Sequence, residues 1–214
     1  MQIELHAIGD KAFDQACRAI KAALDDYPRE DHRHGIIHDC LPTPEGIQIC
    51  RDYHIQMPMQ SAFIGWKQEP DDYLEHILGH DRLEKLNPIR TFRDNNIVVS
   101  FGSDAPCTTP DPIAWMDRAV NNDNAGQAVS VQDALRMCTY NGAWAAFDEQ
   151  ERGSLEAGKI ADMAVLSENP YTVPKDKLSG LRVERLYLGG KPYESCRESI
   201  LPMMLRGLTS RNKA

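Results

Sequence analysis

Several features that mark common classes of protein are missing from this sequence. Its 214 residues contain no apolar run near the roughly 20 residues that a membrane-spanning helix needs. The net charge is −8, and the 24 basic residues form no surplus or stripe of the kind that nucleic-acid binders carry. Residues 1–5 show neither the basic segment nor the apolar stretch of an export signal. We therefore expect a cytoplasmic protein with no membrane or nucleic-acid partner.

The cysteines also lack a recognisable metal-binding or redox pattern. There are six, and no two of them form a Cys-x-x-Cys pair. Most lie inside apolar patterns, where a thiol behaves as a small hydrophobic side chain. We expect them to be reduced and structural.

What is present is an alternation of short apolar strands and amphipathic helices. Strands are predicted over residues 2–5, 35–37, 55–59 and 97–101. Helices are predicted over residues 11–26, 44–53, 88–94, 111–120 and 130–147. Between them, residues 60–82 mix aromatic, acidic, glycine and proline residues and predict a long loop with one helical turn. Alternating strands and helices predict a parallel sheet covered by helices.

The pattern changes near residue 150. Residues 153–166 and 183–193 predict β-structure, and Gly189-Gly190 between two strand-like runs predicts a hairpin turn. We therefore expect one unit over residues 1–150 and part of a small β domain over residues 151–194. Residues 195–214 form a tail to which the sequence assigns no role.

Three of the predicted strands lead into a residue that can bind a metal ion. These residues are His6, His38 and Asp104. In α/β barrels the carboxyl ends of the strands build the active site. Two imidazoles and a carboxylate suit zinc or a similar divalent ion, and such an ion lowers the pKa of a bound water. Asp104 would either bind the metal or take a proton from the attacking water and pass it to a leaving nitrogen.

Each of these residues also has a structural interpretation. A single histidine at a strand end is more often a hydrogen-bonded structural residue than a ligand, and an aspartate after Gly-Ser is often a turn residue. The functional interpretation is favoured because all three occupy equivalent places in successive strand–helix units. The other histidines receive no metal role: His32 and His34 are expected in a solvated loop, and no motif surrounds His54, His76 or His80.

Four motifs, taken in order, resemble the amidohydrolase superfamily. They are HAIGD at residues 6–10, RHGIIH at 33–38, FGSDAP at 101–106 and GSLEAGKIAD at 153–162. The branch that they most resemble contains the N-substituted formamide deformylases, and the similarity extends to about Tyr193. The resemblance implies a metal-dependent (β/α)8 barrel hydrolase whose substrates are amides, ureas, cyclic amides or amino-heterocycles.

The resemblance also implies roles for single residues. His6 is similar to the metal ligand on the family's fifth barrel strand, His38 to that on the sixth, and Asp104 to the eighth-strand aspartate that binds metal or water and moves protons. The His-x-His pair of the first strand and the bridging residue of the fourth have no counterpart, and Ile37 stands where the family commonly has glutamate. The expected fold is therefore the C-terminal half of a (β/α)8 TIM-type barrel followed by part of a small β domain.

Two functions follow from this fold. The first is a metal-dependent amidohydrolase, with zinc as the expected metal, that cleaves a non-peptide C–N bond of a small amide-like substrate. Because half a barrel has two open sheet edges, a homo-oligomer, a domain swap or a separate N-terminal half would have to complete it. The second is a catalytically inactive, truncated barrel that acts as an oligomerisation or interaction module, for which the apolar residues 200–205 would supply contacts.

Substrate specificity is expected to lie in the long loop at residues 60–80. Phe63 and Trp66 are candidates to line an apolar pocket there. Aromatic residues in loops are more often packing anchors, so both interpretations stay open.

Overall fold

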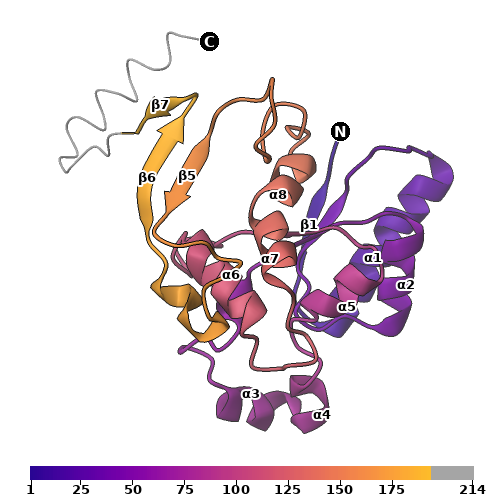
Figure 1. Ribbon diagram of the computed structural model, residues 1–214. Coiled ribbons are helices and arrows are strands. Elements are labelled where there is room, and N and C mark those ends of the chain that lie inside the picture. The colour runs from indigo at the N-terminus through magenta and orange to yellow at the C-terminus, as the bar shows by residue number, and fades with distance from the viewer. Residues whose placement is uncertain (194–214) are drawn as a thin grey trace, which may run out of the picture.

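The first part of the chain is built on four parallel strands, as the computed structural model, which describes residues 1–193, shows (Figure 1). Strand β1 pairs in parallel with β2, and β3 pairs in parallel with β4. A parallel bridge between Gly35 and Gln56 joins the two pairs, so the strands follow one another in sequence order. Their bounds are Glu4–Ala7 (β1), Gly35–His38 (β2), Met57–Met59 (β3) and Val99–Phe101 (β4).

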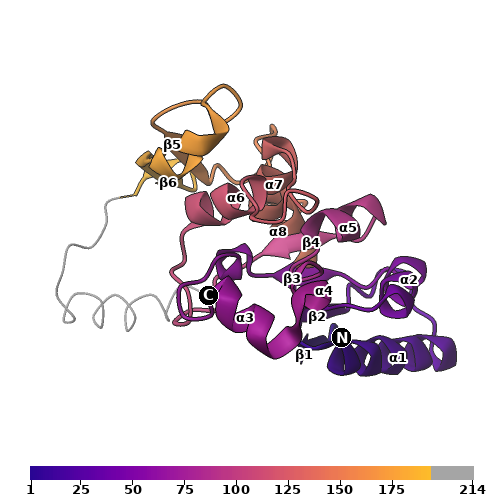
Figure 2. The ribbon, with the colours of Figure 1, turned by 90° about the horizontal axis from the view of Figure 1, so that it is seen from below.

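Helices connect these strands, and α1, α2 and α5 lie together on one side of them (Figure 2). Helices α7 and α8 pack against β4, and α6 packs against α7. The predicted alternation of strands and helices around a parallel arrangement is therefore present. The helix bounds are Asp10–Asp26 (α1), Pro44–Asp52 (α2), Ile89–Asp94 (α5), Pro112–Val120 (α6), Val131–Cys138 (α7) and Tyr140–Ala145 (α8).

Local sequence signals explain where several of these helices begin. Thr43 precedes Pro44 and accepts a hydrogen bond from the Gly46 N–H through its side chain at 3.0 Å, which starts α2 as predicted. Ser130 and Asp133 form a capping box at the start of α7. In α1 the apolar residues recur every three or four positions, and the buried ones are Phe13, Ala16, Cys17, Ile20 and Leu24.

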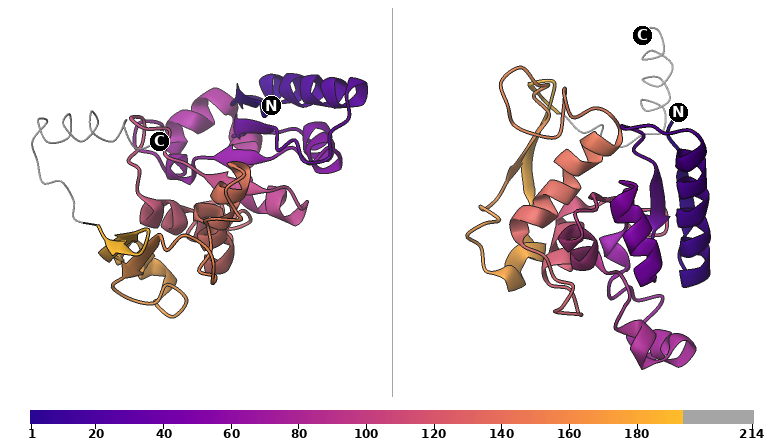
Figure 3. Two further views of the ribbon diagram at one scale, coloured as in Figure 1. Left: turned by 90° about the horizontal axis from the view of Figure 1, so that it is seen from above. Right: turned by 90° about the vertical axis from the view of Figure 1, so that its right-hand side faces the viewer.

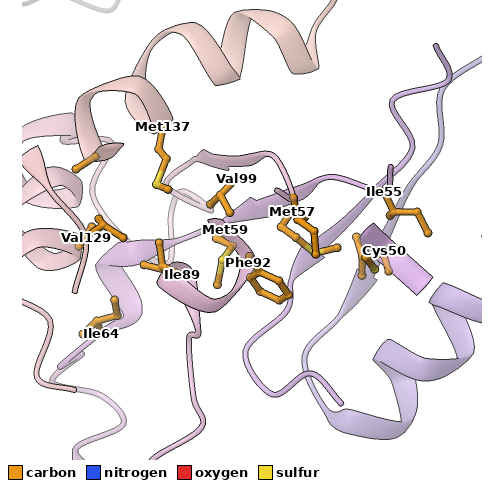
Figure 4. Close-up of a cluster of buried hydrophobic side chains, with 14 of the residues drawn as sticks. Cys50, Ile55, Met57, Met59, Ile64, Ile89, Phe92, Val99, Val129 and Met137 are labelled. Carbon is orange, nitrogen blue, oxygen red and sulfur yellow. The ribbon is translucent and has the colours of Figure 1, made fainter. Parts of the chain in front are cut away.

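The hydrophobic core lies between the strands and these helices (Figure 4). Met57, Met59 and Val99 project from β3 and β4, and each is at most 1% exposed. Phe92 from α5 and Met137 from α7 pack onto them. Successive strand residues face opposite sides, so Glu4 and His6 on β1 point to the other face, where both are exposed. One face of the strands is thus packed, and the opposite face at β1 is open.

A small antiparallel sheet follows at the other end of the molecule from α1 (Figure 3). It is formed by β5 (Met163–Leu166), β6 (Val183–Leu188) and β7 (Lys191–Pro192). Gly189 and Gly190 have φ of 57° and 77° between β6 and β7, as the predicted hairpin turn requires. The 3-10 helix η2 (Lys175–Gly180) packs against α6. No helix of residues 1–193 is long and apolar enough to cross a membrane.

The predicted loop at residues 60–82 is wrong in part, because this segment contains three short helices. They are the 3-10 helix η1 (Ser61–Phe63), α3 (Asp71–Leu78) and α4 (His80–Leu83). Neither α3 nor α4 has a fully buried residue, and both project from the rest of the chain (Figure 1). A helix that buries no stripe of side chains leaves no clear apolar period in the sequence.

The helix predicted over residues 130–147 is divided, and this prediction is corrected too. Thr139, with φ −128° and ψ −89°, separates α7 from α8. Its hydroxyl donates to the Leu135 carbonyl at 2.7 Å, and the Asn141 side chain donates to the Val99 carbonyl at 2.7 Å. The contact of Asn141 with Val99 holds α8 against β4, a tertiary effect that local pattern does not contain.

The β-structure predicted over residues 153–166 is also shorter than expected. Only β5 is a strand, and residues 153–162 form turns in which the Ile160 N–H donates to the Glu151 carbonyl at 2.8 Å. Gly153 and Gly158 have φ of 86° and 97°, which interrupts any extended run. The predicted tail at residues 195–214 lies outside the described residues.

Candidate functional site

Two of the predicted metal ligands lie side by side. The imidazole rings of His6 and His38 have centroids 4.5 Å apart and meet edge to face at 76°. The register of β1 and β2 places His6 opposite Ile37, with His38 one residue further on. His38 has φ of 81°, which ends the regular strand and turns its backbone at this point. The two histidines therefore meet at the carboxyl ends of neighbouring parallel strands.

The two imidazoles differ in their surroundings. His6 is exposed, whereas His38 is only 5% exposed. Burial lowers the pKa of His38, and the charge of a neighbouring His6 lowers it further, against the opposing effects of Gln60 and Asp104. The Nδ1 atom of His38 is buried and has no hydrogen-bond partner among residues 1–193. A neutral ring with an unpaired nitrogen is the form in which histidine binds metals.

Asp104 follows β4 and faces the same end of the strands. It is exposed, has φ of 52°, and lies near enough to His38 for its charge to raise the pKa of that ring. The loop around it is held by local hydrogen bonds: the Cys107 N–H donates to the Asp104 carbonyl at 2.9 Å, and the Thr108 hydroxyl donates to the Ser103 carbonyl. Within residues 1–193, the Asp104 carboxylate forms no hydrogen bond or ion pair.

The three predicted residues do not form a complete metal site by themselves. Within residues 1–193, no group of three His, Cys, Asp or Glu side chains is close enough to hold a metal ion. The structure brings His6 and His38 together and places Asp104 within electrostatic reach of His38.

The expectation that His32 and His34 lie in a solvated loop is wrong. They are 2% and 7% exposed, and their rings lie 4.5 Å apart. His32 donates from Nε2 to the Tyr53 carbonyl at 2.9 Å and accepts the His34 N–H on Nδ1 at 2.9 Å, while His34 Nδ1 accepts the Ile3 N–H at 3.1 Å. The charged residues next to them in the sequence indicated exposure. The Tyr53 and Ile3 backbone groups that bind the two rings come from distant segments, so the sequence pattern did not indicate this burial.

Asp39 is a buried acidic residue next to a candidate ligand that the sequence reasoning did not single out. It directly follows His38, is fully buried, and neither carboxylate oxygen has a hydrogen-bond partner among residues 1–193. Burial raises the pKa of this carboxyl well above its usual range, and the nearby Cys17 thiol adds to the effect. Its place beside His38 in the RHGIIHD motif was the available signal.

An aromatic row leads away from the histidine pair. Phe63 lies 6.1 Å from His38 between ring centroids, and Trp66 lies 5.0 Å from Phe63. Trp66 lines an open cavity of about 680 Å³ whose wall also includes Ala105, Pro106 and Arg118. Ala105 and Pro106 directly follow Asp104 in the chain, but none of His6, His38 and Asp104 lines this cavity. Of the two roles expected for Trp66, lining a pocket and anchoring the loop by packing, the structure shows the first.

Comparison with known proteins identifies the family. The model of the amidohydrolase family matches residues 1–193. The chain belongs to the amidohydrolase family. The chain is 34% identical over 152 residues to the N-substituted formamide deformylase of Arthrobacter pascens. The aligned region covers 68% of this chain and 26% of the deformylase.

Solved structures show the same fold as this amidohydrolase chain. An uncharacterised metal-dependent hydrolase from Pyrococcus furiosus has a TM-score of 0.69 and 25% identity, over 80% of this chain and 34% of that one. The zinc complex of the atrazine chlorohydrolase from Arthrobacter aurescens TC1 has a TM-score of 0.62 and 17% identity, over 98% of this chain and 48% of that one. The chain spans 26% to 37% of the length of the first curated relatives it matches.

Proposed function

We propose that this chain supplies part of the active site of a metal-dependent amidohydrolase that cleaves a non-peptide C–N bond in a small amide-like substrate. The observation that carries the proposal is the His6–His38 pair at the carboxyl ends of two neighbouring parallel strands. Family membership supports it, and so does similarity to a deformylase, whose name describes removal of a formyl group from nitrogen.

The fold in this proposal is the C-terminal half of a (β/α)8 barrel over residues 1–150, followed by part of a small β domain. Four parallel strands in sequence order with helices on one face support it. Among the described residues, β1 pairs only with β2 and β4 only with β3, so each leaves an edge unpaired. Another segment, from a second copy or a separate N-terminal half, would cover these edges and complete the barrel.

The donor set fits a divalent metal, and zinc is the ion that we propose. Two close imidazoles with a carboxylate nearby are the ligand types that zinc prefers, and the unpaired Nδ1 of His38 needs a partner. When bound, the metal would supply a water with a pKa near neutrality. Because residues 1–193 hold no group of three ligands, we propose that further ligands come from the segment that completes the barrel.

Residues of this chain would then have separate roles in binding the metal, moving a proton and excluding water. Burial lowers the pKa of His38, which favours the neutral ring that a metal needs, and this ring lies against that of His6. Asp104, exposed on its turn, would accept a proton from the attacking water and deliver it to the leaving nitrogen. Phe63 and Trp66 would form an apolar wall beside the reacting carbonyl and keep bulk water away from it.

Metal content and oligomeric mass of the purified chain test this proposal. Wild-type protein should hold zinc in a defined oligomer, and His38→Ala should lose it. His76→Ala is the matched control, because His76 is exposed on α3 and its side chain forms no hydrogen bond within residues 1–193. Equal metal content in wild type and His38→Ala would refute a metal role for the histidine pair.

The alternative is a catalytically inactive interaction module. The absence of a three-ligand group within residues 1–193 is the observation that favours it. It predicts an oligomer that contains no metal and hydrolyses no amide after zinc is added. The same two measurements therefore separate the two functions.

A further inference from the structure

Gln60 carries a buried amide whose oxygen is left unpaired at the carboxyl end of β3. It directly follows Met59, the last residue of that strand, and is only 8% exposed. The Phe63 N–H donates to its backbone carbonyl at 3.0 Å, so the start of η1 holds the backbone in place. The side-chain Oε1, however, accepts no hydrogen bond from any group of residues 1–193. A buried acceptor without a donor is costly, so this atom needs an explanation.

His38 has the complementary unpaired atom. Of its two ring nitrogens, only Nδ1 is among the buried, unpaired atoms of the described chain; Nε2 forms no hydrogen bond there either, so it is open to solvent. Burial lowers the pKa of this ring, and the Gln60 side chain is near enough to raise it in opposition. An amide raises the pKa of an imidazole through its oxygen, since an acceptor favours the protonated ring. The amide oxygen of Gln60 is thus the group that matches Nδ1.

The same amide also lies beside the loop that leads to Asp104. The Gly102 N–H donates to the Met59 carbonyl at 3.0 Å, which brings the end of β4 next to Gln60. The Nε2 atom of Gln60 is 4.0 Å from the place that a Cβ on Gly102 would occupy. Gln60 therefore comes from the strand between those that lead to His38 and Asp104, and its side chain approaches both neighbouring segments.

We propose that Gln60 is a positioning residue that holds His38 as the tautomer protonated on Nδ1 and so leaves the lone pair of Nε2 for the metal. The inference rests on the proposed function for the identity of that ligand. A neutral imidazole has one ring proton, and the partner of a nitrogen selects where it lies. The last torsion of a glutamine is broad, so its oxygen can turn toward Nδ1–H. The reverse orientation, with the amide nitrogen on Nδ1, would put the proton on Nε2 and block it.

The ring nitrogen shifts of His38 in ¹⁵N NMR spectra of the full, metal-free chain at a pH where the ring is neutral test the inference. The signal that disappears in His38→Ala identifies the residue. Wild type should carry the proton on Nδ1. Gln60→Met has a similar length but no amide oxygen, and it should move the proton to Nε2, which water can reach. Gln60→Glu keeps an acceptor and should retain the wild-type tautomer, as should Gln132→Met at an exposed position on α7.

Two outcomes would overturn the inference: a wild-type ring protonated on Nε2, or an unchanged Nδ1 proton in Gln60→Met with its fold intact by circular dichroism. If Gln60→Met does not fold, wild type and Gln60→Glu decide, because protonation on Nδ1 supports the inference and protonation on Nε2 contradicts it.

Zinc titration of the same proteins separates the inference from the proposed function. Gln60→Met should raise the Kd for zinc roughly 10-fold or more, the usual effect of removing the partner of a metal-binding histidine, and Gln60→Glu should raise it less. Since the tautomer is read without metal, a wild-type chain that binds no zinc contradicts the proposed metal site alone. A wild-type chain that binds zinc but carries its proton on Nε2 when metal-free contradicts the role of Gln60 alone.

Discussion

His6 and His38 come from neighbouring strands but are not paired in the register, because His6 stands opposite Ile37. Their rings nevertheless lie 4.5 Å apart, where the backbone turns at His38 with φ of 81°. A residue held in this backbone region carries a cost that the surrounding structure has to offset. The two rings therefore come together at the end of β2, where the backbone leaves the extended conformation.

The ion pair of Arg33 with Glu149 should contribute measurably to stability. Both side chains are nearly buried, and Nη1 and Nη2 of Arg33 donate to the two carboxylate oxygens of Glu149 at 2.8 Å each. Glu149→Gln would leave the guanidinium only its ion pair with the exposed Asp31, and we expect the free energy of unfolding to fall by about 1–3 kcal/mol. Urea denaturation measures this change.

The exposed pair of Arg51 with Asp52 provides the control. Its N–O distance of 2.9 Å is nearly the same, but both side chains are about half exposed. Asp52→Asn should change stability by less than about 0.5 kcal/mol. Equal effects of the two substitutions would mean that burial of the first pair is not what makes it stabilising.

The buried pair of His32 and His34 should make the fold sensitive to acid. Burial lowers the pKa of both rings below the usual 6.5, and Nδ1 of His32 must stay unprotonated to accept the His34 N–H. The unfolded chain binds protons first as pH falls through 6.5, so stability is greatest above that pH and declines below it until the folded rings protonate. Midpoints of urea unfolding between pH 7.5 and 5 measure the slope.

His32→Gln should show a shallower decline over this range, since one of the responsible groups is gone. His80→Gln, a change at an exposed side chain on α4, should keep the slope of the wild type. A slope that is the same in all three proteins would show that other groups cause the pH dependence.

Cys17 and Cys50 should be protected from alkylation in the folded protein. Their sulfur atoms lie 3.4 Å apart, and both residues are fully buried. The contact with Cys17, together with burial, raises the pKa of Cys50 far above its usual range, which suppresses the reactive thiolate. Among the cysteines of residues 1–193, the exposed Cys107 should react first with iodoacetamide, and Cys17 and Cys50 only after unfolding, as peptide mass spectrometry can establish.

Gly46 in α2 should tolerate no side chain. A Cβ at this position would lie 2.4 Å from Cε1 of the fully buried Phe13 in α1. Gly46→Ala would force the two helices apart, and we expect a loss of about 1–3 kcal/mol in the free energy of unfolding. Gly142→Ala in α8 meets nothing within 4 Å and should instead stabilise by up to about 1 kcal/mol. Thermal melts of both variants test this contrast.

Several helices and the last hairpin follow from local sequence signals. The apolar period of residues 11–26 predicted α1, Thr43-Pro44 predicted the start of α2, and Gly189-Gly190 predicted the last hairpin. These signals work because an amphipathic period, a capping side chain and a glycine with positive φ act within a few residues of chain. The family motifs likewise indicated the amidohydrolase family, which the family match confirms.

Tertiary structure alone decided the features that depend on distant partners. His32 and His34 are buried because Tyr53 and Ile3 supply their hydrogen bonds, and α8 turns away from α7 where Asn141 reaches the Val99 carbonyl. The sequence could nominate His6, His38 and Asp104 one strand at a time. How near they lie to one another depends on strand register and on backbone turns after each strand, which are settled only when the strands pack.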